Sequence, residues 1–210
     1  MEEIKVVSTV CLVFTLCMFS AGIPDCLKMW RTRSTQNIPF LPFLVTCINN
    51  LIWLYYGLWQ QDSTLIIVNA VGAVLQSICM FTYMVASKQK SRPMSQILVG
   101  VVVLTTLYLY LTIVITSPTV LVDRLGLAGA GITMLMYTSP MMELVTVVRT
   151  KSTRSISRPL TVATFFASSL WFYYGYLLQD LYVQVPNLPG IISSIVRLYL
   201  FWRYPGEKLA

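Results

Sequence analysis

The sequence contains no histidine, and only 11% of its 210 residues are charged. Histidine is the most common general acid or base and a frequent metal ligand near neutral pH, so its absence counts against many enzyme mechanisms. The five cysteines lack metal-ligand spacing, and no phosphate-binding glycine loop occurs. The sequence therefore predicts a protein that is not an enzyme and that uses neither a metal nor a cofactor.

Charge is scarce because the chain is apolar: 56% of its residues are hydrophobic and its mean hydropathy is +0.70. The apolar runs are continuous, without strict alternation, and about 20 residues long, which is the length of a helix that crosses a bilayer. No cleavage site follows the first run, so we expect it to be retained as a helix. The sequence predicts an all-α integral membrane protein with seven spans. They are Val6–Leu27, Ile38–Leu58, Thr64–Val85, Met94–Ile115, Leu125–Val148, Pro159–Leu178 and Tyr182–Trp202.

The net charge of +7 could indicate a nucleic-acid or anionic-lipid partner in a soluble protein. Here the basic residues lie in alternate linkers, while the opposite side carries mostly carboxylates with only Lys5 and Arg124. Because basic loops stay cytoplasmic, we expect an extracellular or lumenal N-terminus and a cytosolic C-terminus. The basic residues are thus explained by topology, so we expect the lipid bilayer as a partner and no nucleic acid. No sorting signal chooses between plasma membrane and Golgi. The basic side carries Lys28, Arg31, Arg33, Lys88, Lys90, Arg92, Arg149, Lys151, Arg154, Arg158, Arg203 and Lys208.

Two segments of the chain repeat one another without a gap. A Trp-x-Tyr-Tyr-Gly motif begins at Trp53 and again at Trp171, and Asn69 recurs as Asn187. Both pairs have the same offset, since 171 − 53 = 118 and 187 − 69 = 118. The two tryptophans fall on the second and sixth spans, so the fourth span is the extra crossing that makes two three-helix repeats parallel. This 3+1+3 order predicts a first repeat over 1–88, a linker helix over 89–118 and a second repeat over 119–210.

The repeated asparagines and tryptophans are the sharpest candidates for a binding site. At about 1.5 Å of rise per residue, Asn69 and Trp53 reach similar depths, roughly 10–14 Å below the outer turn, and Asn187 and Trp171 repeat this. Two amides and two indoles at one level could enclose a sugar, because amides bond hydroxyls and indole faces stack on its C–H surface. Alternatively, each amide bonds a neighbouring helix. No charged side chain is expected at this level, which counts against proton or sodium coupling.

Charged groups recur nearer the cytoplasmic ends of the spans. Asp25 and Glu143 are repeat mates, since 143 − 25 = 118, and Arg197 lies ten residues inward of Asn187. We hypothesise that Arg197 pairs with one of these carboxylates and closes the cytosolic side; a snorkelling arginine is the alternative. Prolines near the same ends permit bending or simple packing kinks. They are Pro24, Pro39, Pro42, Pro140 and Pro159.

Taken together, these features resemble the SWEET sugar facilitators over essentially the whole chain, and most of all the animal members. The resemblance rests on the Lys/Arg-Ser-Thr turns, the Trp-x-Tyr-Tyr-Gly motifs, the repeated asparagine, the 3+1+3 order and the segment Met136-Tyr137-Thr138-Ser139-Pro140. It implies a uniporter for monosaccharides, chiefly glucose, that works by alternating access without a coupling ion. It also implies assembly into homo-oligomers, often trimers.

The resemblance also implies roles for single residues. Family pocket positions fall on Asn69, Asn187, Trp53 and Trp171. The outer gate of the family falls on Tyr56 and Asp180. Its four hinge prolines fall on Gly22, Pro42, Pro140 and Ser157, so two of them are not proline here, and the nearby Pro24 and Pro159 are candidate substitutes.

Three other interpretations stay open at this point. A G-protein-coupled receptor also has seven spans, but the internal repeat, the short loops and the lack of an outer-face cysteine pair disfavour it. A related PQ-loop carrier of amino acids would be expected to place a charged group in the pocket. A membrane scaffold without transport activity would tolerate changes at the pocket positions.

Overall fold

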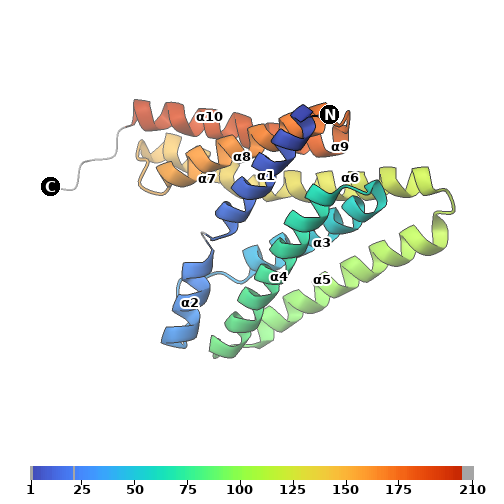
Figure 1. The fold of residues 1–210 in the computed structure, drawn as a ribbon. Coiled ribbons are helices and arrows are strands. Elements are labelled where there is room, and N and C mark those ends of the chain that lie inside the picture. Colours follow the sequence, from blue (N-terminus) through green and yellow to red (C-terminus); the bar gives the residue numbers. More distant parts are fainter. Residues whose placement is uncertain (1, 21, 205–210) are drawn as a thin grey trace. The chain divides into compact units, whose positions relative to one another are not determined.

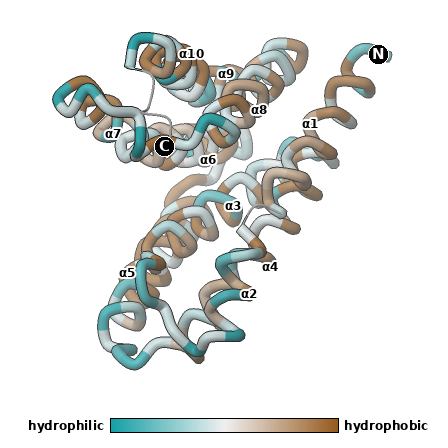
Figure 2. Tube along the Cα trace, turned by 90° about the vertical axis from the view of Figure 1, so that its left-hand side faces the viewer, coloured by the Kyte–Doolittle hydropathy of each residue, from teal (hydrophilic) through white to brown (hydrophobic). Residues whose placement is uncertain are grey.

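Over residues 2–20 and 22–204, which the computed structural model describes, the chain is helical and contains no strand (Figure 1). The helices are largely hydrophobic along their lengths, and hydrophilic residues gather at their ends and in the loops (Figure 2). In order, the elements are α1 (Glu2–Ser20), α2 (Ile23–Thr32), α3 (Leu41–Gln60), α4 (Ser63–Ala86), α5 (Ser91–Leu109), a π-helical turn η1 (Tyr110–Val114), α6 (Pro118–Met136), α7 (Thr138–Thr150), α8 (Arg158–Leu177), α9 (Leu181–Gln184), a 3-10 turn η2 (Val185–Asn187) and α10 (Leu188–Arg203).

These elements form the seven spans of the predicted class. Five segments are long and apolar enough to cross a membrane, and α8 and the broken helix α9–α10 complete the set. The predicted all-α, seven-helix membrane fold is confirmed. The five segments are Glu2–Thr32, Leu41–Gln60, Ser63–Ala86, Ser91–Val114 and Pro118–Thr150.

The chain divides into two compact units, one formed by residues 12–129 and the other by residues 1–11 with 130–210. The first unit holds α2 to α5 with η1, and the second holds α7 to α10 with η2. Each unit is described below by itself. The three-part division expected from the repeat, 1–88, 89–118 and 119–210, stays a prediction.

The outer turn of each repeat is built in the same way. Gln61 adopts a left-handed conformation (φ 56°), and the Asp62 amide donates to the Gly57 carbonyl at 3.0 Å, which closes α3 with a Schellman motif. The Asp62 carboxylate then accepts from two backbone amides and caps α4. In the second repeat the same roles fall to Gln179, Gly175 and Asp180. The repeat seen in the sequence is therefore a repeat of backbone geometry.

Two spans predicted as continuous helices are interrupted by proline. A proline has no N–H, and its ring clashes with the carbonyl four residues earlier. That residue is Ser20 for Pro24 and Met136 for Pro140, and these are the residues at which α1 and α6 end. Each span resumes as a short second helix that carries the proline in its first turn.

The last span is interrupted as well, although the sequence predicted one helix over Tyr182–Trp202. After the single turn of α9 the chain passes through the 3-10 turn η2 and resumes as α10. Pro186 and Pro189 lie in this stretch, and each removes a helical hydrogen bond. Asn187 therefore ends a 3-10 turn, whereas its repeat mate Asn69 lies inside the unbroken helix α4.

The fifth span begins at Pro118, seven residues before the predicted start at Leu125. Proline suits the first position of a helix because its fixed φ is helical and its missing N–H has no partner there anyway. The Ser117 carbonyl accepts from the Leu121 amide at 3.0 Å, so the first turn is complete. Asp123 and Arg124, which directly precede the predicted start of the span, therefore lie inside the helix.

Each repeat packs a glycine of its third span against two side chains from its other spans. An ideal Cβ on Gly72 of α4 would lie 2.5 Å from Asn50 Nδ2 and 2.8 Å from Phe19 Cζ, so no larger residue fits without movement. We call this arrangement the glycine socket. The socket of the second repeat is formed by Gly190, Ser168 and Tyr137. Every member again differs from its mate by 118, so the repeat extends to side-chain packing.

Candidate functional site

The two repeated asparagines make the same hydrogen bond to their own helices. Asn69 Nδ2 donates to the Leu65 carbonyl at 2.8 Å, and Asn187 Nδ2 donates to the Val183 carbonyl at 2.8 Å. Neither amide donates to a neighbouring helix within the described part of the chain. Nδ2 carries a second N–H, and Oδ1 accepts no hydrogen bond from the described residues. Each amide thus keeps one donor and one acceptor for a ligand.

Packing register brings a tryptophan level with the asparagine in the first unit. Helices α3 and α4 are joined by a tight turn and run antiparallel, and Gly57 lies against Leu65 while Asn50 lies against Gly72. Trp53 is four residues from Gly57, and Asn69 is four residues from Leu65. Because antiparallel helices rise equally per residue, Trp53 and Asn69 lie at one depth.

The second unit repeats this register despite its broken helix. Gly175 of α8 lies against Gln184, and Ser168 lies against Gly190 of α10. Trp171 is three residues from Ser168, and Asn187 is three residues from Gly190, so Trp171 lies level with Asn187. Within each unit the structure therefore pairs an indole and an amide at one depth, as the sequence spacing predicted.

A tyrosine supports each tryptophan edge to face. The rings of Trp53 and Tyr56 lie 5.3 Å apart at 85°, and those of Trp171 and Tyr174 lie 5.7 Å apart at 84°. Such T-shaped pairs are the favoured aromatic geometry. Gly129 of α6 lies on the Trp53 indole, since a Cβ there would come within 3.0 Å of Trp53 Cε2. The indole orientations are thus fixed by packing.

Arg197 forms the ion pair that the sequence left open between two carboxylates. Its Nη2 lies 2.8 Å from Glu143 Oε2 and donates to the Pro140 carbonyl at 3.1 Å. Arg197 is 8% exposed, so its guanidinium is largely desolvated. The repeat mate of Arg197 is Cys79, since 197 − 118 = 79, so the first repeat has no equivalent pair. A gating role of Arg197 stays a prediction.

The ion pair gives a prediction with a matched control. Glu143→Ala should lower the free energy of unfolding by about 1 kcal/mol, because Arg197 loses its charged partner although Glu143 is 44% exposed. Asp25→Ala removes the repeat mate, which faces no arginine, and should change the unfolding temperature by less than half as much. Thermal unfolding in detergent, followed by tryptophan fluorescence, measures both. Equal losses in the two variants would show that the pair contributes nothing specific.

The predicted gate and hinge residues occupy structural positions within each unit. Tyr56 is fully buried and accepts a hydrogen bond from Gln60 Nε2 at 3.0 Å, whereas Asp180 caps α9. Pro42 and Pro159 lie in the first turns of α3 and α8, where proline costs no hydrogen bond. Pro24 and Pro140 follow the breaks in the first and fifth spans. Their gate and hinge roles stay predictions.

The sequence predicts close helix contact at the repeated glycines Gly57, Gly72, Gly175 and Gly190, but it did not identify the side chains that form the glycine sockets. Tyr137 Oη and Ser168 Oγ lie 3.1 Å apart in one socket, whereas Asn50 Nδ2 in the other is buried without a hydrogen-bond partner among the described residues. The signal was present in the sequence, because Gly72 and Gly190 are repeat mates and a conserved offset at glycine indicates close contact.

A sequence model of one protein family matches the chain twice, over residues 5–91 and 123–209, and its description is a sugar efflux transporter for intercellular exchange. The two matches begin 123 − 5 = 118 residues apart, the offset read from the sequence. The match and the seven-helix fold define a membrane transporter rather than an enzyme. The chain belongs to this family, the SWEET transporters, as the resemblance predicted.

Several full-length relatives support the assignment. Proteins described as "Sugar transporter SWEET1" are 45% identical in Danio rerio (96% of this chain, 92% of that one), 47% in Mus musculus (96% and 91%) and 44% in Homo sapiens (94% and 90%). The solved structure of a eukaryotic SWEET transporter has the same fold, with a TM-score of 0.86 at 23% identity over 97% of both chains.

Proposed function

We propose that this protein is a passive, bidirectional uniporter for monosaccharides, chiefly glucose, that works by alternating access. The observation that carries the proposal is the indole and amide placed at one depth in each repeat, Trp53 with Asn69 and Trp171 with Asn187. Each amide offers a donor and an acceptor to sugar hydroxyls, and each indole offers a flat apolar face to the sugar ring. Relatives described as sugar transporters support this choice of substrate class.

The absence of charge near the site positions supports uncoupled transport. No charged residue occurs in the segments Leu41–Gln60 and Ser63–Ala86, which carry Trp53 and Asn69. In the second repeat, Arg197 lies ten residues from Asn187, or about 15 Å along a helix. Proton- and sodium-driven carriers usually place an ionisable group along the substrate path. A neutral sugar moving down its gradient needs none.

We propose further that the N-terminus is extracellular or lumenal and the C-terminus cytosolic, because the basic linkers lie on the side of the C-terminus. The plasma membrane and the Golgi both suit this orientation. The same proposal includes roles for single residues. The outer gate is formed by Tyr56 and Asp180, and Arg197 belongs to the cytosolic gate. The hinges are Pro24, Pro42, Pro140 and Pro159. The proposal also includes a homo-oligomer, for which a trimer is expected in mass measurements of the detergent-solubilised protein.

Uptake of radiolabelled glucose into liposomes that contain the purified protein tests the proposal. Uptake should equilibrate the inside and outside concentrations, and an inward proton gradient should change neither the rate nor the final level. Protein-free liposomes and labelled leucine are the controls. Accumulation above equilibrium under the gradient would contradict a uniporter, and transport of leucine instead of glucose would favour the amino-acid carrier.

A further inference from the structure

A polar cavity of about 550 Å³ lies in the unit of residues 12–129, away from the tryptophan and asparagine level. It is half open and is lined by the C-terminal ends of α2 and α4, the turn after each of them and the start of α5. Its lining residues are Thr32, Arg33, Ser34, Thr35, Gln36, Tyr83, Ala86, Ser87, Lys88, Gln89, Arg92 and Pro93. Such a volume is large enough for a phosphorylated headgroup.

Positive charge without a partner distinguishes this cavity. Arg33, Lys88 and Arg92 line it, no carboxylate is found among the described residues of its lining, and none of the three forms an ion pair with a described residue. Cations at the ends of α2 and α4 also complement the helix C-termini and the positive-inside rule. Neither effect explains why three cations line one half-open cavity, whereas an anionic ligand would.

Hydroxyl groups also line the cavity. The Tyr83 ring packs against Phe40, with centroids 5.0 Å apart, and the Ser87 hydroxyl already donates to the Gln89 carbonyl at 2.9 Å. Thr35 lines the cavity and makes no side-chain hydrogen bond to a described residue, whereas its repeat mate Thr153 donates to the Tyr204 carbonyl at 3.0 Å. Hydroxyls together with arginine and lysine are the usual ligands of phosphate oxygens.

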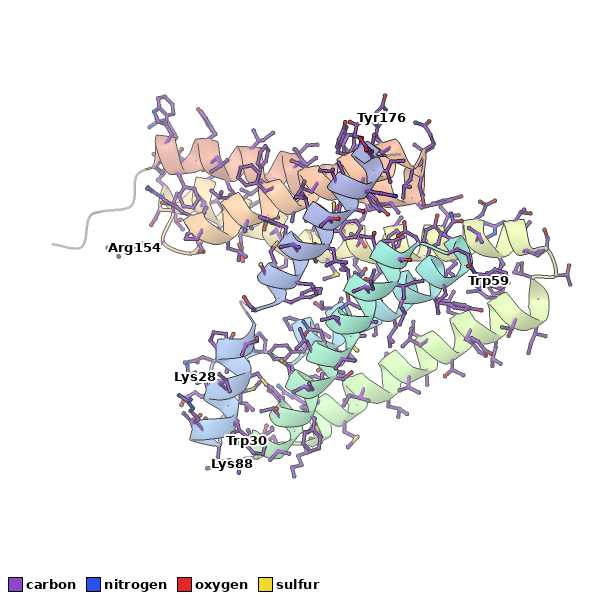
Figure 3. The ribbon with its side chains drawn as sticks, viewed as in Figure 1. Lys28, Trp30, Trp59, Lys88, Arg154 and Tyr176 are labelled. Carbon is purple, nitrogen blue, oxygen red and sulfur yellow. The ribbon has the colours of Figure 1, made fainter. Side chains whose placement is uncertain are left out.

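The surroundings of the lining residue Arg33 have the features of a membrane–water interface. The Arg33 guanidinium lies over the Trp30 ring, 4.5 Å from its centroid, and Trp30 is 50% exposed. Figure 3 shows Trp30 and Lys88 near the same ends of α2 and α4, with Lys28 about halfway along α2 and Trp59 at the far end of α3. Exposed tryptophans beside basic residues are typical of the headgroup level of a bilayer.

We propose that this cavity binds a phosphate-bearing anion, and that the phosphorylated headgroup of an anionic phospholipid is its source. Arg33, Lys88 and Arg92 bind the phosphates, the Thr35 hydroxyl adds a hydrogen bond, and Trp30 lies beside the glycerol and acyl region. The site is separate from the sugar site proposed above, so its occupancy can be measured whether or not the protein carries glucose. With the proposed orientation, the lipid belongs to the cytosolic leaflet.

Binding to the purified full-length protein in a neutral detergent tests this proposal. The probes are dioctanoyl phosphatidylinositol bisphosphate, dioctanoyl phosphatidylcholine as the uncharged comparison, and inositol trisphosphate as the soluble phosphate. Native mass spectrometry counts the bound molecules, and titration gives the affinity. We expect one bisphosphate lipid per chain and no saturable binding of phosphatidylcholine. Inositol trisphosphate should bind more weakly than the lipid; equal affinity would show that a soluble phosphate ester is the ligand and would overturn the lipid source.

A matched pair of charge variants locates the site. Arg33→Gln combined with Arg92→Gln should weaken binding about 30-fold, from the loss of two cations at a membrane surface. The control, Arg149→Gln with Lys151→Gln, removes two cations from the corresponding turn of the second repeat, where Lys151 is the mate of Arg33. It should stay within about twofold of the wild type. Equal weakening in both variants, or no saturable binding by the wild type, would overturn the proposal. Thermal unfolding checks that both variants are folded.

Discussion

Asn187→Ala is expected to reduce glucose uptake about fivefold to 150-fold while the protein stays folded. The change removes the free acceptor and the free donor that the amide retains beside its bond to Val183. Each hydrogen bond to a neutral group contributes about 0.5–1.5 kcal/mol, so the loss of two hydrogen bonds to the sugar corresponds to this range. Initial rates of labelled glucose uptake into liposomes measure the effect, with equal amounts of incorporated protein.

The matched control is Ser193→Ala on the same helix. Ser193 Oγ is buried and donates to the Gly190 carbonyl at 3.2 Å, so this variant also removes a polar group that bonds its own helix. If Asn187→Ala acted only through helix stability, the two variants would lose uptake alike. We expect Ser193→Ala to transport normally, and Asn69→Ala, the repeat mate, to show the defect of Asn187→Ala. Normal uptake by both asparagine variants would contradict the proposed site.

The helices could be predicted because their causes lie in consecutive residues. Continuous apolar runs give the spans, and the caps at Asp62 and Asp180 recur with the offset that reveals the repeat. The interruptions were harder to predict, because a proline tells where a hydrogen bond is lost but not whether the helix bends or breaks. Pro24 and Pro140 break their spans, whereas Pro42 begins a helix, and only the positions of the surrounding turns distinguish these outcomes.

The partner of Arg197 could not be chosen from helical spacing alone, since Asp25 and Glu143 are repeat mates at equivalent depths. The repeat itself contained the answer: Cys79 occupies the position of Arg197 in the first repeat, and its thiol neighbours Asp25 and Cys26. Each carboxylate thus faces the third span of its own repeat. Close contact at Gly72 and Gly190 could be predicted from their shared offset, but the partner side chains could not. They depend on which faces of three helices meet, and apolar helices carry little periodic signal for that.

Gly190→Ala is expected to lower the free energy of unfolding by about 1–3 kcal/mol, the usual cost of forcing an extra group into a packed interior. The new Cβ would lie 2.5 Å from Tyr137 Oη and closer still to Ser168 Oγ, so both side chains must move and their hydrogen bond is broken. Thermal unfolding in detergent should show a lower midpoint, by about 2–4 °C per kcal/mol for a chain of this size.

Gly131→Ala is the control, because nothing lies within 4 Å of its ideal Cβ and alanine favours a helix by up to about 1 kcal/mol. This variant should unfold at the wild-type temperature or above. Adding Tyr137→Phe and Ser168→Ala to Gly190→Ala removes the two oxygens that the new methyl group meets, and should recover part of the loss. If Gly190→Ala were as stable as Gly131→Ala, the close contact of Gly190 with Ser168 and Tyr137 would be contradicted. The register that aligns Trp171 with Asn187 would then lose its support.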